Sequence, residues 1–178
     1  FRPADTTETI ECWEMALENF NTPSVLTLTR QKLSPIRKEF GKENKCSLGA
    51  YEILRTNEKI DLTIFASGSE VSLAIDVSHK LATQNTHSKV ISVPCQELFD
   101  KQKVDYQTKI LDENKHKISI EAGTTDTWKK YIGNNGISFG LNDFGKSAPY
   151  KDIYKNFKLT VDDIVKSTQE MIKENNQD

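Results

Sequence analysis

The sequence predicts an α/β fold in three layers, in which helices cover both faces of a mostly parallel five-stranded sheet. Short apolar runs that suit buried strands alternate with segments of helical periodicity, the order expected of parallel strands joined by right-handed crossovers. The clearest unit, residues 60–81, changes from strand to helix periodicity at a single glycine. A chain of 178 residues is also long enough to bury a sizeable core.

In this unit the apolar run 62–65 predicts a strand, and Gly68 suits the strained turn that follows it. Ser67 or Ser69 offers a hydroxyl to cap the helix, and Glu70 places negative charge in its first turn. One face of the helix then carries Val71, Ala74, Ile75 and Ser78.

The N-terminal region predicts a helix and then a strand. Asp5 and Glu8 resemble a capping box at the start of the helix. The helix carries an apolar stripe that must dock on another surface, formed by Ile10, Trp13, Leu17 and Phe20. Residues 25–28 predict a strand, which places Arg30 at the carboxyl end of a strand, where α/β sheets bind ligands.

Residues 35–48 are polar and aperiodic, which is typical of a linker, and they separate residues 1–34 from a domain at 49–178. The first strand of that domain should be antiparallel, because only a tight turn joins it to Asp61. This first strand is expected near 49–55, and the strands after the unit 60–81 are expected near 90–93, 118–121 and 137–141. Helices are expected near 98–110, 128–131 and 160–172, with a fraying tail at 174–178.

Charge and cysteine content limit the function. The 24 basic and 26 acidic residues are mixed along the chain, so neither a nucleic acid nor a membrane surface is an expected partner. The three cysteines lack a paired spacing, which indicates free thiols in a reducing cytoplasm. The chain opens on FRPADTTET, with helix-start signals and no Met, so we interpret it as a fragment of a longer polypeptide.

Several other residues could be assigned a chemical role, but a structural explanation is simpler for each of them. The loop 68–70 is better explained as a helix cap than as a phosphate site, because Glu70 would repel an anion. Residues 143–145 spell DFG without the other kinase motifs. Glu121 has no second catalytic group in view, so a structural role is expected. None of the histidines has partners at metal-ligand spacing, so they are expected to be solvated. They are His79, His87 and His116.

Arg30 differs from these residues in the chemistry of its side chain. A guanidinium at the end of a strand offers a fork of donors that matches the oxygens of a phosphate, although a surface ion pair would explain it equally well. It is the one candidate binding residue that the pattern suggests.

Segments in serial order along the chain resemble the C-terminal part of transketolases. They read FRPAD, PSVLTLTRQ, GAYEIL, ASGSEVSLA, VISVPCQELFDKQ, IEAGTTDTWKKYIG and DFGKSAPYKDIYKNFKLTVDDIV, and they cover the chain nearly end to end. The resemblance implies that residues 1–34 are the end of the middle, pyrimidine-binding domain. Residues 49–178 would then be the C-terminal domain of this family.

The resemblance also implies a function. Transketolases transfer a two-carbon ketol unit between sugar phosphates in the pentose phosphate pathway, as cytoplasmic homodimers that use thiamine diphosphate and Mg²⁺ or Ca²⁺. The family's cofactor and metal residues fall outside this chain, so we expect no catalytic, cofactor-binding or metal-binding residue in it. The fragment alone should be inactive and should stabilise the dimer. The family's phosphate-binding arginine corresponds to Arg30, with Thr29 in place of a serine.

Two alternatives stay open. A related thiamine diphosphate enzyme would share the fold: dihydroxyacetone synthase, deoxyxylulose-phosphate synthase or the β subunit of a 2-oxo-acid dehydrogenase. A non-catalytic interaction or regulatory module would need no cofactor. The FG-x-SAP stretch favours transketolase among the enzymes, and the sequence upstream of Phe1 would discriminate between them.

Overall fold

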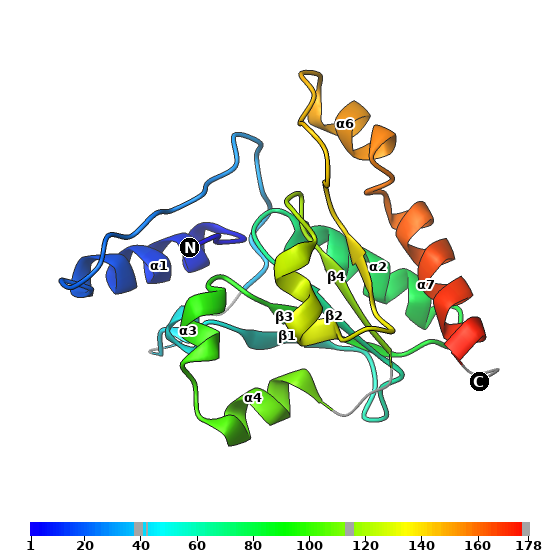
Figure 1. Cartoon of the computed structure of the whole chain (residues 1–178), viewed down its shortest axis with the longest axis horizontal. Coiled ribbons are helices and arrows are strands. Elements are labelled where there is room, and N and C mark those ends of the chain that lie inside the picture. The colour runs from blue at the N-terminus through cyan, green and yellow to red at the C-terminus, as the bar shows by residue number, and fades with distance from the viewer. Residues whose placement is uncertain (38–40, 42, 113–115, 176–178) are drawn as a thin grey trace.

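The protein forms a five-stranded mixed sheet covered by helices on both faces (Figure 1), and this computed structural model describes residues 1–37, 41, 43–112 and 116–175. The strand order is β1-β3-β2-β4-β5, with β1 antiparallel to β3 and the other pairs parallel. This arrangement confirms the predicted fold class, although the antiparallel partner of β1 is β3 and not its chain neighbour. The strands are β1 (Tyr51–Arg55), β2 (Leu62–Ala66), β3 (Ser88–Ser92), β4 (His116–Ile120) and β5 (Ile137–Phe139).

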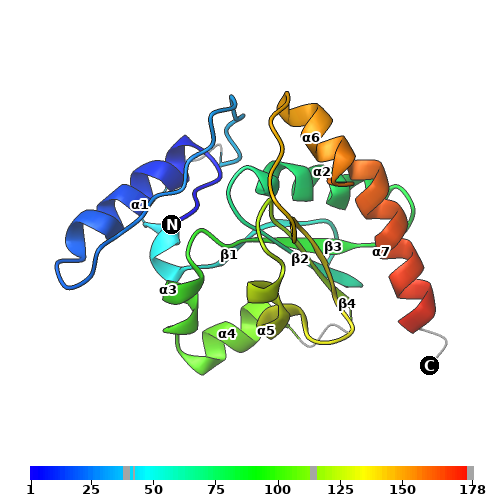
Figure 2. The same ribbon diagram turned by 45° about the horizontal axis from the view of Figure 1, so that its top comes forward.

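The helices divide between the two faces of the sheet (Figure 2): α2 and α7 lie on one face, and α3, α4 and α5 lie on the other. Helix α6 was not predicted. The helices are α1 (Thr6–Glu18), α2 (Glu70–Ala82), α3 (Gln96–Asp100), α4 (Val104–Leu111), α5 (Lys129–Ile132), α6 (Tyr150–Asn156) and α7 (Val161–Asn175), with 3₁₀ turns η1 (Lys45–Leu48) and η2 (Asp126–Trp128). None of the described helices is long and apolar enough to cross a membrane.

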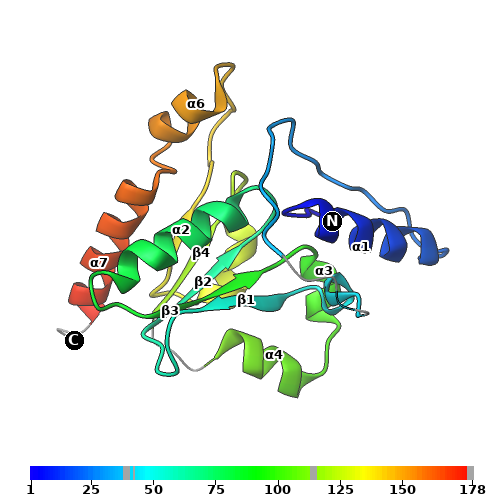
Figure 3. The same ribbon diagram turned by 180° about the vertical axis from the view of Figure 1, so that it is seen from behind.

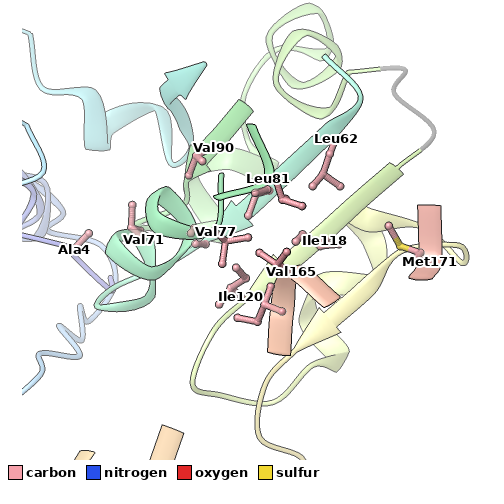
Figure 4. Close-up of a cluster of buried hydrophobic side chains, with 14 residues drawn as sticks. Ala4, Leu62, Val71, Val77, Leu81, Val90, Ile118, Ile120, Val165 and Met171 are labelled. Atoms are coloured by element: carbon pink, nitrogen blue, oxygen red, sulfur yellow. The ribbon is translucent and has the colours of Figure 1, made fainter. Parts of the chain in front are cut away.

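The larger core lies between the sheet and the pair α2 and α7 (Figure 4). Alternate residues of the central strands point into it, because successive side chains of a strand face opposite sides of a sheet. Its fully buried members include Leu62, Ile64, Val77, Ile118 and Ile164. The opposite face carries a second core rich in aromatic rings, built from Phe65, Phe99, Trp128 and Tyr131 with aliphatic neighbours.

The ends of α2 and α7 test the predicted helix signals. Gly68 adopts a φ of +57° in the turn after β2, as predicted. Ser69 holds the N-cap position of α2, but no side chain caps the helix. The hydroxyl of Ser69 instead donates to the Glu70 carboxylate. At α7, the Asp163 backbone N–H donates to the Thr160 hydroxyl over 3.3 Å, which confirms the predicted cap.

Helix α1 begins as predicted but buries an unexpected face. Asp5 caps it by accepting the Glu8 backbone N–H over 2.8 Å. The predicted apolar stripe is exposed, with Trp13 at 51% and Leu17 at 67% exposure. The buried side chains of α1 are instead Thr7, Glu8, Glu11 and Cys12. Within this chain the stripe therefore does not dock as expected, because polar side chains supply the contacts of α1, and docking on a second copy stays a prediction.

One histidine differs from its expected exposure, and parts of the predicted linker and tail lie outside the described residues. His116 is 7% exposed, at the start of the buried strand β4, so it is not a solvated histidine, whereas His79 is exposed. Residues 38–40 and 42 of the predicted linker and 176–178 of the predicted tail lie outside the described residues. One part of the linker is fixed to α1, since the Asp5 carboxylate accepts the backbone N–H groups of Ile36 and Arg37.

Candidate functional site

Arg30, the predicted phosphate-binding residue, lies exposed on a surface loop. Residues 23–29 form no strand, so the expected position at a strand end is wrong. The segment makes only two ladder-like bonds with the N-terminus: the Phe1 amino group donates to the Val25 carbonyl over 2.7 Å, and the Thr27 N–H donates to the Phe1 carbonyl over 2.8 Å. Within the part of the chain that the structure describes, no carboxylate forms an ion pair with Arg30.

The N-terminal segment crosses the carboxyl ends of the parallel strands. The Arg2 N–H donates to the Pro94 carbonyl after β3 over 2.8 Å, and the Gly68 N–H after β2 donates to the Arg2 carbonyl over 2.9 Å. Figure 3 shows, from behind, the N-terminus and α1 beside this end of the sheet. Residues 1–4 thus lie along the edge at which open α/β sheets bind ligands.

The Arg2 guanidinium bridges two carboxylates at this edge. Its Nη2 lies 2.9 Å from Oε2 of Glu70, and its Nη1 lies 2.7 Å from Oε1 of Glu121. Glu70 begins α2 and its side chain is fully buried, while Glu121 follows β4 and is 17% exposed. A buried carboxylate needs such a partner, because moving an unpaired charge out of water is costly.

Further donors hold each carboxylate. Glu70 accepts the Ala122 N–H over 2.9 Å and the hydroxyls of Ser69 and Tyr154. Glu121 accepts the Ser67 hydroxyl over 2.6 Å and the Trp128 indole N–H over 2.8 Å. Burial, and then the neighbouring Glu70 charge, raise the pKa of Tyr154 to about 12, so this hydroxyl stays protonated and donates at neutral pH.

Two hollows flank this cluster. A pocket of about 420 Å³ opens between the ends of β2, β3 and β4, lined by Ser67, Cys95, Glu97, Glu121 and Thr124, among others. A smaller one of about 230 Å³ lies between residues 27–29 and Tyr154, with Gly68 and Ser69 at its wall. Arg2 lines both hollows, as do Thr27 and Ala122.

A second buried cluster joins α1 to the sheet. The Glu8 carboxylate accepts the Ala4 N–H, the Tyr51 hydroxyl and the Ser92 hydroxyl, over 2.7, 2.7 and 2.5 Å. Burial raises the pKa of Glu8, against the effect of these hydrogen bonds, and it also raises the pKa of Tyr51. This cluster ties the N-terminal helix to β1 and β3.

One turn along α1, Glu11 forms an ion pair with Arg37 over 2.7 Å and accepts the Cys46 N–H over 3.0 Å. Burial opposes ionisation of Glu11, but the hydrogen bonds from Arg37 and Cys46 outweigh it and lower the pKa of this carboxyl. All three cysteines are free thiols, as their spacing suggested, and all three are buried.

Sequence patterns missed most of these contacts. The sequence pattern places Glu70 at the start of a helix, where its charge suits the helix dipole, and it includes Arg2 and Glu8 only in a motif and in a helix cap. One signal was present: acidic residues at 70 and 121 adjoin otherwise apolar strand and helix segments, which suits a buried pair. The partner, Arg2, lies 68 residues from Glu70 and was not visible from local spacing.

The described residues do not fit a divalent metal site. No group of three or more His, Cys, Asp or Glu side chains among them is arranged to hold a metal ion. Glu70 and Glu121, which lie at the ligand-binding edge of the sheet, already share the Arg2 guanidinium. No step of a reaction is therefore assigned to a metal or cofactor held by these residues.

The fold is that of a C-terminal domain of transketolase-like enzymes, since the family described as transketolase-like TK C-terminal domain matches residues 49–160. The chain is 41% identical over 174 residues to a transketolase of Sinorhizobium medicae, covering 97% of the chain and 25% of that protein. The chain belongs to the transketolase family.

Solved structures agree with this assignment. Transketolase from Leishmania mexicana superposes with a TM-score of 0.86 at 38% identity, over 97% of this chain and 25% of that one. A Pichia stipitis transketolase in complex with sedoheptulose 7-phosphate gives a TM-score of 0.87 at 36% identity, with the same coverage of 97% and 25%. The chain thus spans about a quarter of the length of the relatives that it matches.

Proposed function

We propose that this chain is the C-terminal part of a transketolase, which transfers a two-carbon ketol unit between sugar phosphates in the cytoplasm. The observation that carries this proposal is the 41% identity over 97% of the chain to a curated transketolase. The sugar phosphate named in the Pichia stipitis complex supports the substrate class. These relatives favour transketolase over the related thiamine enzymes. The whole enzyme would use thiamine diphosphate and a divalent metal, as a homodimer.

In this division of labour, residues 1–34 and 49–178 contribute structure and one substrate contact, and the rest of the enzyme binds the cofactor. The chain alone should then be inactive. Calorimetric titration of the 178-residue chain with thiamine diphosphate and Mg²⁺ tests the assignment, and no heat of binding is expected. A dissociation constant in the micromolar range or tighter would contradict it.

Arg30 is the residue to which we assign the substrate phosphate. Its guanidinium is exposed and has no carboxylate partner among the described residues, so its donors are available to an anion. The Thr29 hydroxyl accepts the Gln31 N–H over 3.4 Å, which shapes the turn that carries it. A planar guanidinium can donate two parallel hydrogen bonds to a phosphate, which a point charge cannot.

The test replaces Arg30 with alanine in the full-length enzyme. A hydrogen bond to a charged group contributes about 1.5–3 kcal/mol, so KM for phosphorylated substrates should rise about ten- to a hundred-fold. Hydroxypyruvate as donor with glycolaldehyde as acceptor carries no phosphate, and the rate of that reaction should hardly change. Arg55→Ala is the matched control, because Arg55 is also partly exposed but lies on β1, where it pairs with Glu52.

Equal losses with phosphorylated and phosphate-free substrates would contradict the phosphate role and would assign Arg30 to the fold or to the cofactor region. A loss in kcat as well as KM, confined to phosphorylated substrates, would show that the contact also aligns the substrate.

A further inference from the structure

The crevice between the ends of β2 and β4 is the topological switch point of this sheet. The chain leaves β2 toward β3 on one side, and it leaves β4 toward β5 on the other. Loops that diverge in this way open a crevice at the carboxyl ends of the strands, where α/β proteins bind small ligands. In this chain the crevice holds the side chain of Arg2.

We propose that this crevice is a guanidinium-binding site, that Arg2 is its internal ligand, and that the contact fastens the N-terminal segment to the C-terminal domain. The proposal concerns the docking of two parts of one chain and does not depend on the proposed function.

The C-terminal domain supplies the whole receptor. Glu70 starts α2 and Glu121 follows β4, and both belong to residues 49–178. Donors other than Arg2 hold their carboxylates: Tyr154 and the Ala122 N–H hold Glu70, while Trp128 and Ser67 hold Glu121. The two acceptors are therefore oriented before a guanidinium arrives, which reduces the entropy lost on binding.

The geometry selects a guanidinium and not a simple ammonium. Two different nitrogens of Arg2 contact two different carboxylates, Nη1 with Glu121 and Nη2 with Glu70. A planar fork can span two acceptors in this way, whereas the ammonium of a lysine is a single compact charge. Within the described ranges, Arg2 is also the only cation paired with either carboxylate.

The floor of the crevice is shaped for the stem of this side chain. A Cβ atom built on Gly68 would lie 2.9 Å from Cγ of Arg2 and 3.1 Å from its Nε. A residue larger than glycine at position 68 would push the arginine stem away, quite apart from the strain of its positive φ. Glycine at position 68 thus allows the turn before α2 and also leaves space for the side chain of Arg2.

The experiment removes the side chain of Arg2 by mutation and adds a small guanidinium compound in its place. Arg2→Ala deletes the atoms beyond Cβ, and ethylguanidinium has the same atoms in the same order. In the 178-residue chain this variant should melt roughly 5–15 °C below wild type, because two carboxylates lose their cation, one of them fully buried.

Ethylguanidinium chloride at millimolar concentration should restore about half of that loss or more, in a saturable way, since a ligand that binds only the folded state raises the melting temperature. Ethylammonium chloride at the same ionic strength should restore far less. Arg55→Ala is the control for a surface arginine: its melting temperature should fall only slightly, and ethylguanidinium should not raise it.

If Arg2→Ala does not fold, ethylguanidinium should restore its folded circular dichroism signal on refolding from urea, and Arg2→Lys provides a folded variant with the charge retained. Arg2→Lys should melt below wild type because one ammonium cannot span both carboxylates. Equal recovery with both cations, recovery of Arg55→Ala, no recovery of Arg2→Ala in either assay, or wild-type melting of Arg2→Lys would each overturn the proposal.

Discussion

The carboxylate of Glu8 lies 2.7 Å from the hydroxyl of Tyr51, so the N-terminal helix and the edge strand β1 share a buried hydrogen bond. Glu8 is 1% exposed and Tyr51 is 4% exposed. A buried acid in such a place makes the docking of α1 dependent on pH, because its protonation differs between the folded and unfolded chain.

Replacing Glu8 with glutamine should flatten this pH dependence. Burial raises the folded pKa of Glu8 above its ordinary value of 4.5, so the folded state binds a proton more tightly than the unfolded one. That contribution is fully present below about pH 4.5 and is lost as the pH rises through the folded pKa. Relative to wild type, Glu8→Gln should therefore gain stability on going from pH 4.5 to neutral pH.

Urea unfolding at a series of pH values measures this difference. Glutamine can still accept from the Ala4 N–H and donate to both hydroxyls, so the variant should fold. A constant difference in stability between the variant and wild type across the series would show that Glu8 does not titrate in this range.

Glu11→Gln should have the opposite pH dependence. The folded pKa of Glu11 is lowered, so its contribution is present above its ordinary value of 4.5 and is lost as the pH falls through the folded pKa. At neutral pH the variant should lose about 1.5–3 kcal/mol of stability, because the nearly buried Arg37 loses the negative charge of its ion-pair partner.

The comparison with Glu52→Gln isolates the effect of burial. Glu52 pairs with Arg55 in a more exposed position, where an ion pair contributes about 1 kcal/mol or less. Equal losses at Glu11 and Glu52 in urea unfolding would mean that the Glu11 pair is no stronger than a surface pair.

Two glycines with similar backbone angles separate strain from crowding. Gly49 has a φ of +75° and Gly133 a φ of +73°, so alanine should cost about 1–2 kcal/mol of backbone strain at either position. A Cβ at Gly49 would lie 2.1 Å from the Phe99 nitrogen, whereas nothing lies within 4 Å at Gly133. Gly49→Ala should therefore be the more destabilising variant by at least about 2 kcal/mol in urea unfolding. Equal losses would show that the loop before β1 yields without cost.

The two tryptophans should differ in accessibility. Trp13 is 51% exposed on α1, and Trp128 is 1% exposed in the aromatic core. In the single-tryptophan variant Trp128→Phe, iodide should quench the fluorescence of Trp13 strongly, and in Trp13→Phe it should hardly quench Trp128. Protection of Trp13 that grows with protein concentration would reveal that a second copy covers the exposed stripe. Protection at every concentration would contradict the exposed position of this side chain.

Local pattern predicted the sheet well because a buried strand needs little more than an apolar run with a turn after it. The five strands, the Gly68 turn and the Thr160 cap are set by residues a few positions apart. The direction of β1 also followed from its short connection, although its partner did not, because pairing with β3 depends on where the intervening β2 lies in the sheet.

The N-terminal region could not be predicted in the same way. Periodicity identified the stripe of Trp13 and Leu17 as the buried face of α1, but Glu8 decides the docking through partners 43 and 84 residues away. Residues 25–28 have strand propensity and lack a full neighbouring strand to complete a ladder. The site at Arg2 likewise required Glu70 and Glu121 to be brought together by the fold.

Helix α6 contributes no buried residue, and its link to the main body includes the hydrogen bond from Tyr154 to Glu70. Separation of this helix from the body would expose little apolar surface, so its opening free energy should be far below that of global unfolding. Its amide hydrogens should exchange with solvent well before those of α7, whose Ile164 and Met171 lie in the core. A protease that samples such openings would cut first in the exposed stretch at residues 143–149, leaving the sheet intact.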